Sequence, residues 1–111
     1  MKVRVVNGGR FVPQAVYVGR PTRWGNPFRV REAGSHAEAV RRYEAYFRER
    51  LKHPKFREAL EALYGRLRRT GTLTLSCHCA PRPCHGEVIA RWLAERGREE
   101  GYEVRVEVEG R

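Results

Sequence analysis

Strand-like and helix-like segments alternate along this chain of 111 residues. Short runs rich in β-branched or aromatic residues occur at 3–6, 15–18, 72–76 and 102–108. Patterns with apolar residues three or four positions apart occur at 35–51, 54–70 and about 84–97. Strands that are separated by helices usually pair in parallel. The sequence therefore predicts a single α/β domain over residues 1–111, a small sandwich with a partly parallel, Rossmann-like sheet and about three helices.

Several element boundaries carry local signals. Ser35 and Glu38 have the Ser-x-x-Glu spacing of a capping box, which predicts a helix start. Pro54 is suited to the first turn of the next helix. The segment at 15–18 lacks clean alternation, so we expect a strand that is covered on both faces. The alternating segment at 102–108 predicts a strand with one wet face, near an edge of the sheet.

Two segments have no secondary-structure period: GRPTRWGNPF at residues 19–28 and CHCAPRPCH at residues 77–85. Each directly follows a predicted strand, the first at 15–18 and the second at 72–76. Parallel α/β sheets bind ligands beyond the carboxyl ends of their strands. If these two strands are adjacent and parallel, the two segments meet at one edge of the sheet. We therefore expect a functional crevice between them.

The composition limits the classes of protein and partner. Lysine and arginine outnumber the acidic residues by 23 to 13, which gives a net charge of +10. Arginine suits phosphate and nucleic acid, although a G+C-rich genome or a hot environment also favours an arginine excess. No segment is long and apolar enough to span a bilayer, and the amino terminus does not read as a signal peptide. We therefore expect a cytoplasmic protein with no membrane partner.

All three cysteines lie in the segment 77–85. An odd number of cysteines in a reducing compartment argues against a disulfide framework and favours metal or thiol chemistry. Cys77, Cys79 and Cys84, with His85 or His78, form a candidate Cys₃His set for tetrahedral zinc. Zinc sites usually draw their ligands from more widely spaced positions, so cysteines that only pack within a turn are the alternative.

A working thiol is the third interpretation of the same segment. We expect Cys84 and His85 in the first turn of the helix after Pro83, where free backbone N–H groups favour a thiolate. Cys84 is then a candidate nucleophile or redox-sensitive thiol beside His85. Glu87 is a candidate general acid or base, but an acidic residue in a first helical turn is favourable without any catalytic role.

The segment 19–28 combines cationic and aromatic side chains. Arg20 and Arg23 can hold phosphate or carboxylate through bidentate contacts. Trp24 and Phe28 offer faces on which a base can stack, and Trp24 is equally suited to plugging the core at the end of the sheet. Asn26 can bind a base edge, although holding the turn is its favoured role. Arg20 is the strongest candidate, because it comes directly after the end of a strand.

Arginines are also frequent in the predicted helices, at positions 41, 42, 48, 50, 66, 68 and 69. Several have glutamate three or four residues away, which predicts a solvated surface of ion pairs. Arg66, Arg68 and Arg69 lack such neighbours and are the candidates for a basic patch that binds nucleic acid.

The segments YVGRPTRWGNPF and LSCHCAPRPCHGEVIA resemble the two boxes of a family known as domain of unknown function 4326, which is found in bacteria and phages. The family pattern is a Gly-Arg-Pro…Trp-Gly-Asn-Pro-Phe box followed by a Cys-x-Cys…Pro…Cys-His-Gly box. The resemblance covers about residues 15–95. It supports the choice of site and implies no reaction.

These observations lead to two classes of function. The first is a protein that binds a nucleotide or another phosphate-bearing small molecule in the crevice beyond strands 15–18 and 72–76. Such a protein would be a small hydrolase or transferase, by analogy with Rossmann-like nucleotide hydrolases. The second class is a nucleic-acid-binding module, zinc-stabilised or metal-free, or a thiol redox sensor. An ATPase or kinase is not indicated, because the chain has no aspartate and no phosphate-binding loop motif.

Overall fold

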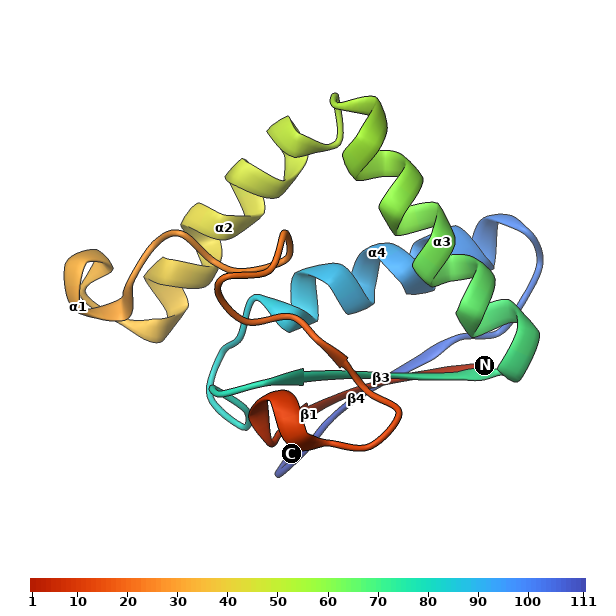
Figure 1. Ribbon diagram of the computed structural model, residues 1–111, viewed down its shortest axis with the longest axis horizontal. Helices are drawn as coiled ribbons and strands as arrows, with labels where there is room; N and C mark the ends of the chain where they lie inside the picture. Colours follow the sequence, from red (N-terminus) through yellow and green to blue (C-terminus); the bar gives the residue numbers. More distant parts are fainter.

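One four-stranded sheet organises the computed structural model, which describes residues 1–111 (Figure 1). Its strands are β1 (Lys2–Asn7), β2 (Val16–Tyr17), β3 (Thr72–Cys77) and β4 (Arg105–Val108). They lie in the order β2-β3-β1-β4, and every neighbouring pair is parallel. The predicted α/β fold is confirmed, and the sheet is fully rather than partly parallel.

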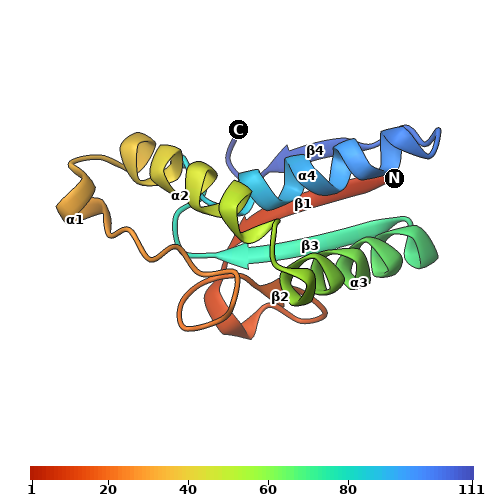
Figure 2. The ribbon, with the colours of Figure 1, turned by 90° about the horizontal axis from the view of Figure 1, so that it is seen from above.

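The three long helices lie on the same side of the sheet, as Figure 1 and Figure 2 show. The helices are η1 (Gly9–Phe11), α1 (Val30–Ala33), α2 (His36–Arg50), α3 (Pro54–Thr70) and α4 (Gly86–Glu99). Helix α3 contacts β3, and α4 contacts β1, β3 and β4. On the other face the short helix η1 contacts β3, where the Ser76 hydroxyl donates to the carbonyl oxygen of Gly9. None of the helices has both the length and the apolar character that a membrane span requires.

The core lies between the sheet and the long helices. In β1, Val3 and Val5 are fully buried and Arg4 between them is exposed, because successive side chains of a strand point to opposite faces. The helical stripes supply the facing layer, with Leu60, Leu67, Ile89 and Leu93 fully buried. The sheet is therefore covered by a packed interior, and the loops that follow the strands begin at their carboxyl ends.

The helix boundaries follow the local signals in the sequence. The hydroxyl oxygen of Ser35 accepts a hydrogen bond from the N–H of Glu38 over 3.0 Å, as the capping box predicts. Pro54 opens α3. Gly71 follows its last residue with φ of 80°, and its N–H donates to the carbonyl of Leu67.

Three predictions about elements were wrong. Strand β2 is a two-residue, half-buried strand at the edge of the sheet and is not covered on both faces. Strand β4 is an edge strand as expected but begins at Arg105, and Tyr102 is exposed. Helix α4 begins at Gly86, so Cys84 and His85 precede its first turn. A hydrophobic pattern records which residues are apolar, whereas backbone hydrogen bonds decide where an element starts.

Candidate metal centre and ligand pocket

The loops that follow β2 and β3 meet beyond the carboxyl ends of these adjacent strands, as predicted. We call residues 19–28 the Trp loop and residues 77–85 the Cys loop. The closest link between the β2 end and the Cys loop joins His85 Nε2 to the carbonyl oxygen of Val18 over 2.6 Å. Each loop contains one cis peptide bond, Arg20–Pro21 and Ala80–Pro81.

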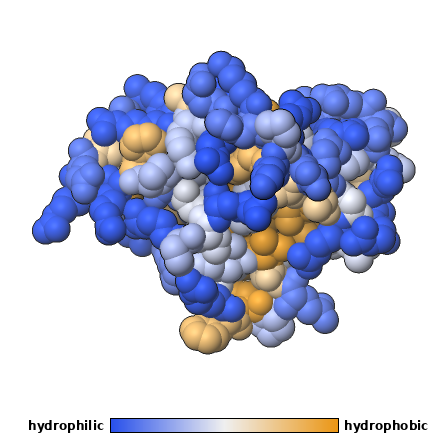
Figure 3. Space-filling view, turned by 45° about the horizontal axis from the view of Figure 1, so that its top comes forward, coloured by the Kyte–Doolittle hydropathy of each residue, from blue (hydrophilic) through white to orange (hydrophobic).

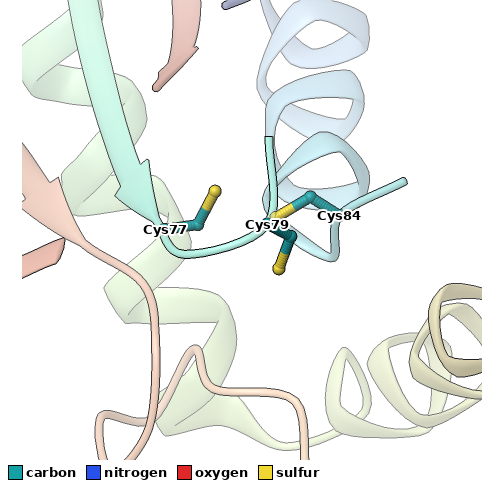
Figure 4. Close-up of side chains that lie close together, drawn as sticks. All are labelled: Cys77, Cys79 and Cys84. Atoms are coloured by element: carbon teal, nitrogen blue, oxygen red, sulfur yellow. The ribbon is translucent and has the colours of Figure 1, made fainter. Parts of the chain in front are cut away.

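The sulfur atoms of the three cysteines lie within 4.8 Å of one another and form no disulfide. Cys77 is the last residue of β3, Cys84 lies two residues before the first residue of α4, and Cys79 lies in the loop between them (Figure 4). Cys77 and Cys84 are fully buried, whereas Cys79 is half-buried. The strand end and the helix start therefore bring together three thiols from a nine-residue segment. We call these three residues the thiol cluster.

The three thiols differ in acidity because they lie close together. Hydrogen bonds from the thiols of Cys79 and Cys84 hold the pKa of Cys77 well below its ordinary value. The same bonds raise the pKa of Cys84 and Cys79, and burial adds to the increase. Cys77 is therefore the most acidic of the three thiols.

The tautomer of His85 follows from its surroundings. The carbonyl oxygen of Val18 can only accept, so Nε2 of His85 carries the proton and donates it. Its other nitrogen, Nδ1, then carries a lone pair that can accept a hydrogen bond from Cys84 Sγ, which lies 3.9 Å away. Burial lowers the pKa of His85, which keeps the ring neutral. His85 therefore presents an unprotonated nitrogen to the nearest sulfur of the thiol cluster.

The predicted catalytic set of Cys84, His85 and Glu87 does not converge on a solvent-accessible space. Cys84 is fully buried, and its sulfur accepts the N–H of Gly86 over 3.4 Å. The Glu87 carboxylate accepts the N–H of Cys84 and pairs with both terminal nitrogens of Arg111, at 2.6 and 2.8 Å. Glu87 thus caps the start of α4 and binds the carboxyl-terminal residue, which is the structural role that the sequence left open.

A pocket of about 290 Å³ lies between the Trp loop, the Cys loop and the start of α2. It is lined by Tyr17, Gly19, Arg20, Asn26, Phe28, Arg29, Val30, His36, Ala39, Val40, His78, Cys79, Pro83 and His85. Cys79 and His85 belong to its wall, so the pocket and the thiol cluster adjoin each other. This is the crevice that the two aperiodic segments predict.

Basic side chains and no acidic ones line the pocket. Arg20 and Arg29 line it together with His36 and His78, and none of the 13 acidic residues of the chain does. Arg20 donates to the carbonyl oxygen of Asn26 over 3.1 Å, which fixes its guanidinium to the Trp loop. Arg29 makes no ion pair. Its positive charge is free to attract an anion.

The Trp loop divides its predicted ligand-binding residues between core and pocket. Phe28 and Arg20 line the pocket, whereas Arg23 is exposed and does not. Trp24 is only 7% exposed and packs on Phe56, with ring centroids 5.3 Å apart. Trp24 is thus a core side chain, which is the alternative that the sequence left open.

Asn26 holds the Trp loop through both ends of its amide. Its Nδ2 donates to the carbonyl of Ala39, and its Oδ1 accepts the N–H of Phe28. Both polar atoms are therefore engaged within the chain. This agrees with the turn-holding role favoured from the sequence.

Four pocket residues carry no local signal that sequence reasoning could use for this role. Tyr17 ends β2, Arg29 precedes α1 and His36 opens α2, and each is ordinary in its own segment. His78, considered only as a metal ligand, instead bonds the Tyr17 hydroxyl through Nε2 over 3.1 Å. Gly9, with φ of 60°, leaves room for the His78 ring, because a Cβ there would lie 2.6 Å from its Cε1 atom. These residues meet only once the sheet has formed.

Four of the seven helical arginines considered from the sequence form ion pairs. Arg41, Arg42 and Arg48 bind glutamates one turn away, as predicted. Arg68, expected to be free, pairs over 3.5 Å with Glu100, which directly follows α4 and is distant from Arg68 in sequence. Hydrophilic side chains dominate the face in Figure 3, where hydrophobic areas are small and separate.

Comparisons with known proteins agree with the two boxes. The profile of the family described as "Domain of unknown function (DUF4326)" matches residues 1–95. The chain is also 37% identical over 76 residues to a protein of Enterobacteria phage T4 named "Uncharacterized 12.4 kDa protein in nrdA-td intergenic region". This match covers 68% of the chain and 63% of the phage protein, so it spans less than two thirds of the relative's length. No solved structure matches the chain significantly.

Proposed function

Because the chain belongs to the family described as domain of unknown function 4326, whose name gives no activity, we propose its function from the site itself. The protein binds a small phosphate-bearing molecule of nucleotide type in the pocket beyond β2 and β3. The observation that carries this proposal is the set of cationic side chains around the pocket, which includes no acidic neighbour. An anion entering this space meets attraction and no compensating repulsion.

The pocket offers one group of side chains to the phosphate of the ligand and another group to its base. Arg20 and Arg29 offer planar guanidinium groups to a phosphate, and His36 lies at the first residue of α2, where the helix dipole favours negative charge. The Phe28 and Tyr17 rings offer apolar faces to a base. A volume of about 290 Å³ is near the lower end of small-molecule sites, about 300 Å³. It therefore favours a mononucleotide-sized ligand over nucleic acid.

Isothermal titration calorimetry with nucleoside monophosphates, unphosphorylated nucleosides and inorganic phosphate tests this proposal. We expect binding of the monophosphates and much weaker binding of either part alone. Each lost charge-assisted hydrogen bond costs about 1.5–3 kcal/mol, so Arg20→Ala and Arg29→Ala should each weaken binding by about tenfold or more. Arg23→Ala is the matched control, because Arg23 belongs to the same loop but does not line the pocket.

Two results would contradict the proposal. Absence of binding by any phosphate compound would exclude an anion pocket. Equal weakening by Arg23→Ala and Arg20→Ala, with a steep decrease of affinity in salt, would indicate nonspecific attraction to the basic surface. In that case a nucleic-acid partner becomes the better hypothesis. Measuring the affinity for single-stranded oligonucleotides tests it.

Turnover of the bound molecule, as a hydrolase or transferase, is the second part of the proposal. The pair of His78 and Tyr17 supports it, because both side chains line the pocket and their polar atoms lie 3.1 Å apart. Such a pair can hold and pass a proton. Chromatography of the incubated ligand detects products, and His78→Gln should lower the rate while changing affinity little. Unchanged turnover in His78→Gln would exclude this role.

A further inference from the structure

The thiol cluster is not explained by ligand binding in the pocket. Cys77 and Cys84 are fully buried and do not line the pocket, and only Cys79 does. Three sulfur atoms nevertheless lie within 4.8 Å of one another. Buried cysteines that only fill space do not need this mutual approach. The close approach of the three sulfur atoms therefore needs an explanation other than ligand binding in the pocket.

The spacing of the sulfur atoms is close to that of a tetrahedral metal site. Zinc binds thiolate sulfur at about 2.3 Å, so two sulfur ligands of one tetrahedral ion lie about 3.8 Å apart. The sulfur atoms of the cluster lie within 4.8 Å of one another, so rotation of the side chains has to close at most about 1 Å to reach this spacing. Soft thiolates favour zinc over the hard cations calcium and magnesium.

The fold explains how ligands so close together in the sequence can surround one ion. Cys77 ends β3, whereas Cys84 and His85 immediately precede α4. The Cys loop turns back between these two elements, so the ligands approach from two directions (Figure 4). A bound ion would tie the end of the strand to the start of the helix.

The side chain of His85 has the features of a fourth ligand. A histidine that binds zinc through one ring nitrogen usually donates the other N–H to a carboxylate or carbonyl oxygen, which fixes its tautomer and orientation. Nε2 of His85 donates to Val18 in this way, and Nδ1 lies 3.9 Å from Cys84 Sγ. In a tetrahedral site the sulfur and nitrogen ligands lie about 3.6 Å apart.

We propose that Cys77, Cys79 and Cys84 through sulfur, and His85 through Nδ1, bind one Zn²⁺ ion beside the pocket. The thiols that are still protonated release their protons to solvent on binding, and the neutral imidazole releases none. The N–H of Gly86 supports the charge by donating to Cys84 Sγ. The ion would stiffen the wall formed by Cys79 and His85. This proposal does not depend on the identity of the pocket ligand.

Elemental analysis of the full chain, purified without a histidine tag, is the direct test. We expect one zinc per chain. Cobalt added to the metal-free chain should give thiolate-to-cobalt absorption that saturates at one equivalent and disappears when zinc is added. His85→Ala should lower zinc affinity at least tenfold and alter the cobalt spectrum. His78→Ala is the matched control, because His78 lies in the same loop and bonds Tyr17 instead.

The contradicting results are specific. A chain that retains no metal and takes up no cobalt, while all three thiols are reduced, would exclude the site. Equal zinc affinity of His85→Ala and the native chain would exclude His85 as a ligand. If His85→Ala does not fold, cadmium NMR of the native chain reports whether nitrogen completes the sulfur set. None of these measurements uses a nucleotide, so failure of the pocket proposal and failure of this one are distinguishable.

Discussion

The ring of His85 donates a hydrogen bond to the carbonyl oxygen of Val18 over 2.6 Å, across 67 residues of sequence. Val18 directly follows β2, and His85 directly precedes α4. The bond therefore joins the end of the edge strand to the Cys loop. Tyr43 of α2 packs against the same imidazole ring, with centroids 5.1 Å apart. Sheet, loop and helix thus meet at one buried side chain.

Replacement of His85 by phenylalanine tests how much the hydrogen bond to Val18 contributes to the stability of the fold. His85→Phe keeps an aromatic ring but removes the donor, so the buried oxygen of Val18 loses a partner. We expect the free energy of unfolding to fall by about 1–3 kcal/mol. Urea denaturation with a chelator present measures it without a metal contribution. His78→Phe, at an exposed position, should change stability by less than about 0.5 kcal/mol, and a similar loss in both variants would contradict the special role of His85.

Trp24 and Phe28 should separate stability from ligand binding. Trp24 is buried against Phe56, and its carbonyl accepts the Tyr43 hydroxyl, whereas Phe28 is half-buried at the pocket. Trp24→Ala should lower the free energy of unfolding by about 3–5 kcal/mol. Phe28→Ala should cost less and weaken ligand binding. Thermal unfolding and calorimetry of both variants check this, and weaker ligand binding by a folded Trp24→Phe variant would contradict the assignment.

Trp24 packs in the core whereas Phe28 lines the pocket, and the sequence alone could not distinguish these two positions. Both are large aromatic residues of one aperiodic loop, and residue type alone cannot say which of them turns inward. The core contacts of Trp24 come from Phe56 of α3 and Tyr43 of α2, which are distant in sequence. Only the packing of these helices decides the orientation.

The helix starts and the position of the site could be predicted from the sequence. Ser35 and Pro54 mark helix starts through interactions within one or two turns, so they could be read locally. The meeting of the two loops followed from strand order, because β2 and β3 are parallel neighbours. The pairing of Glu87 with Arg111 could not be predicted, since Arg111 lies 24 residues away and reaches Glu87 only after β4 joins the sheet.

Glu87 and Arg111 should therefore contribute to stability and not to ligand binding. Glu87→Ala removes the acceptor of the Cys84 N–H, for which a loss of about 1 kcal/mol is typical of a helix cap. A double-mutant cycle with Arg111→Ala should give a coupling of up to about 1 kcal/mol, because Arg111 is partly exposed. Neither residue lines the pocket, so ligand affinity should be unchanged. A large loss of turnover in a stable Glu87→Gln variant would restore the general-acid hypothesis.

Acid should destabilise the contact between α3 and α4 through Glu100. Its carboxylate accepts the Tyr64 hydroxyl at 2.6 Å and pairs with Arg96 at 3.2 Å. The Tyr64 hydrogen bond, followed by Arg96, lowers the pKa of Glu100 below its ordinary value of 4.5. The unfolded chain therefore binds the proton first as the pH falls, so the stabilisation present above about pH 5 is lost below it.

The pH dependence of urea denaturation between pH 7 and pH 3 measures this contribution. Glu100→Gln should be less stable than the native chain at pH 7, and its stability should decrease less steeply below about pH 5, because the linked proton is no longer taken up. Glu99→Gln is the matched control, since Glu99 is exposed at the preceding position and makes no side-chain hydrogen bond or ion pair. Parallel pH profiles for the native chain and Glu100→Gln would show that other carboxylates carry the acid sensitivity. A flattened profile in Glu100→Gln alone would assign it to the contact with Tyr64.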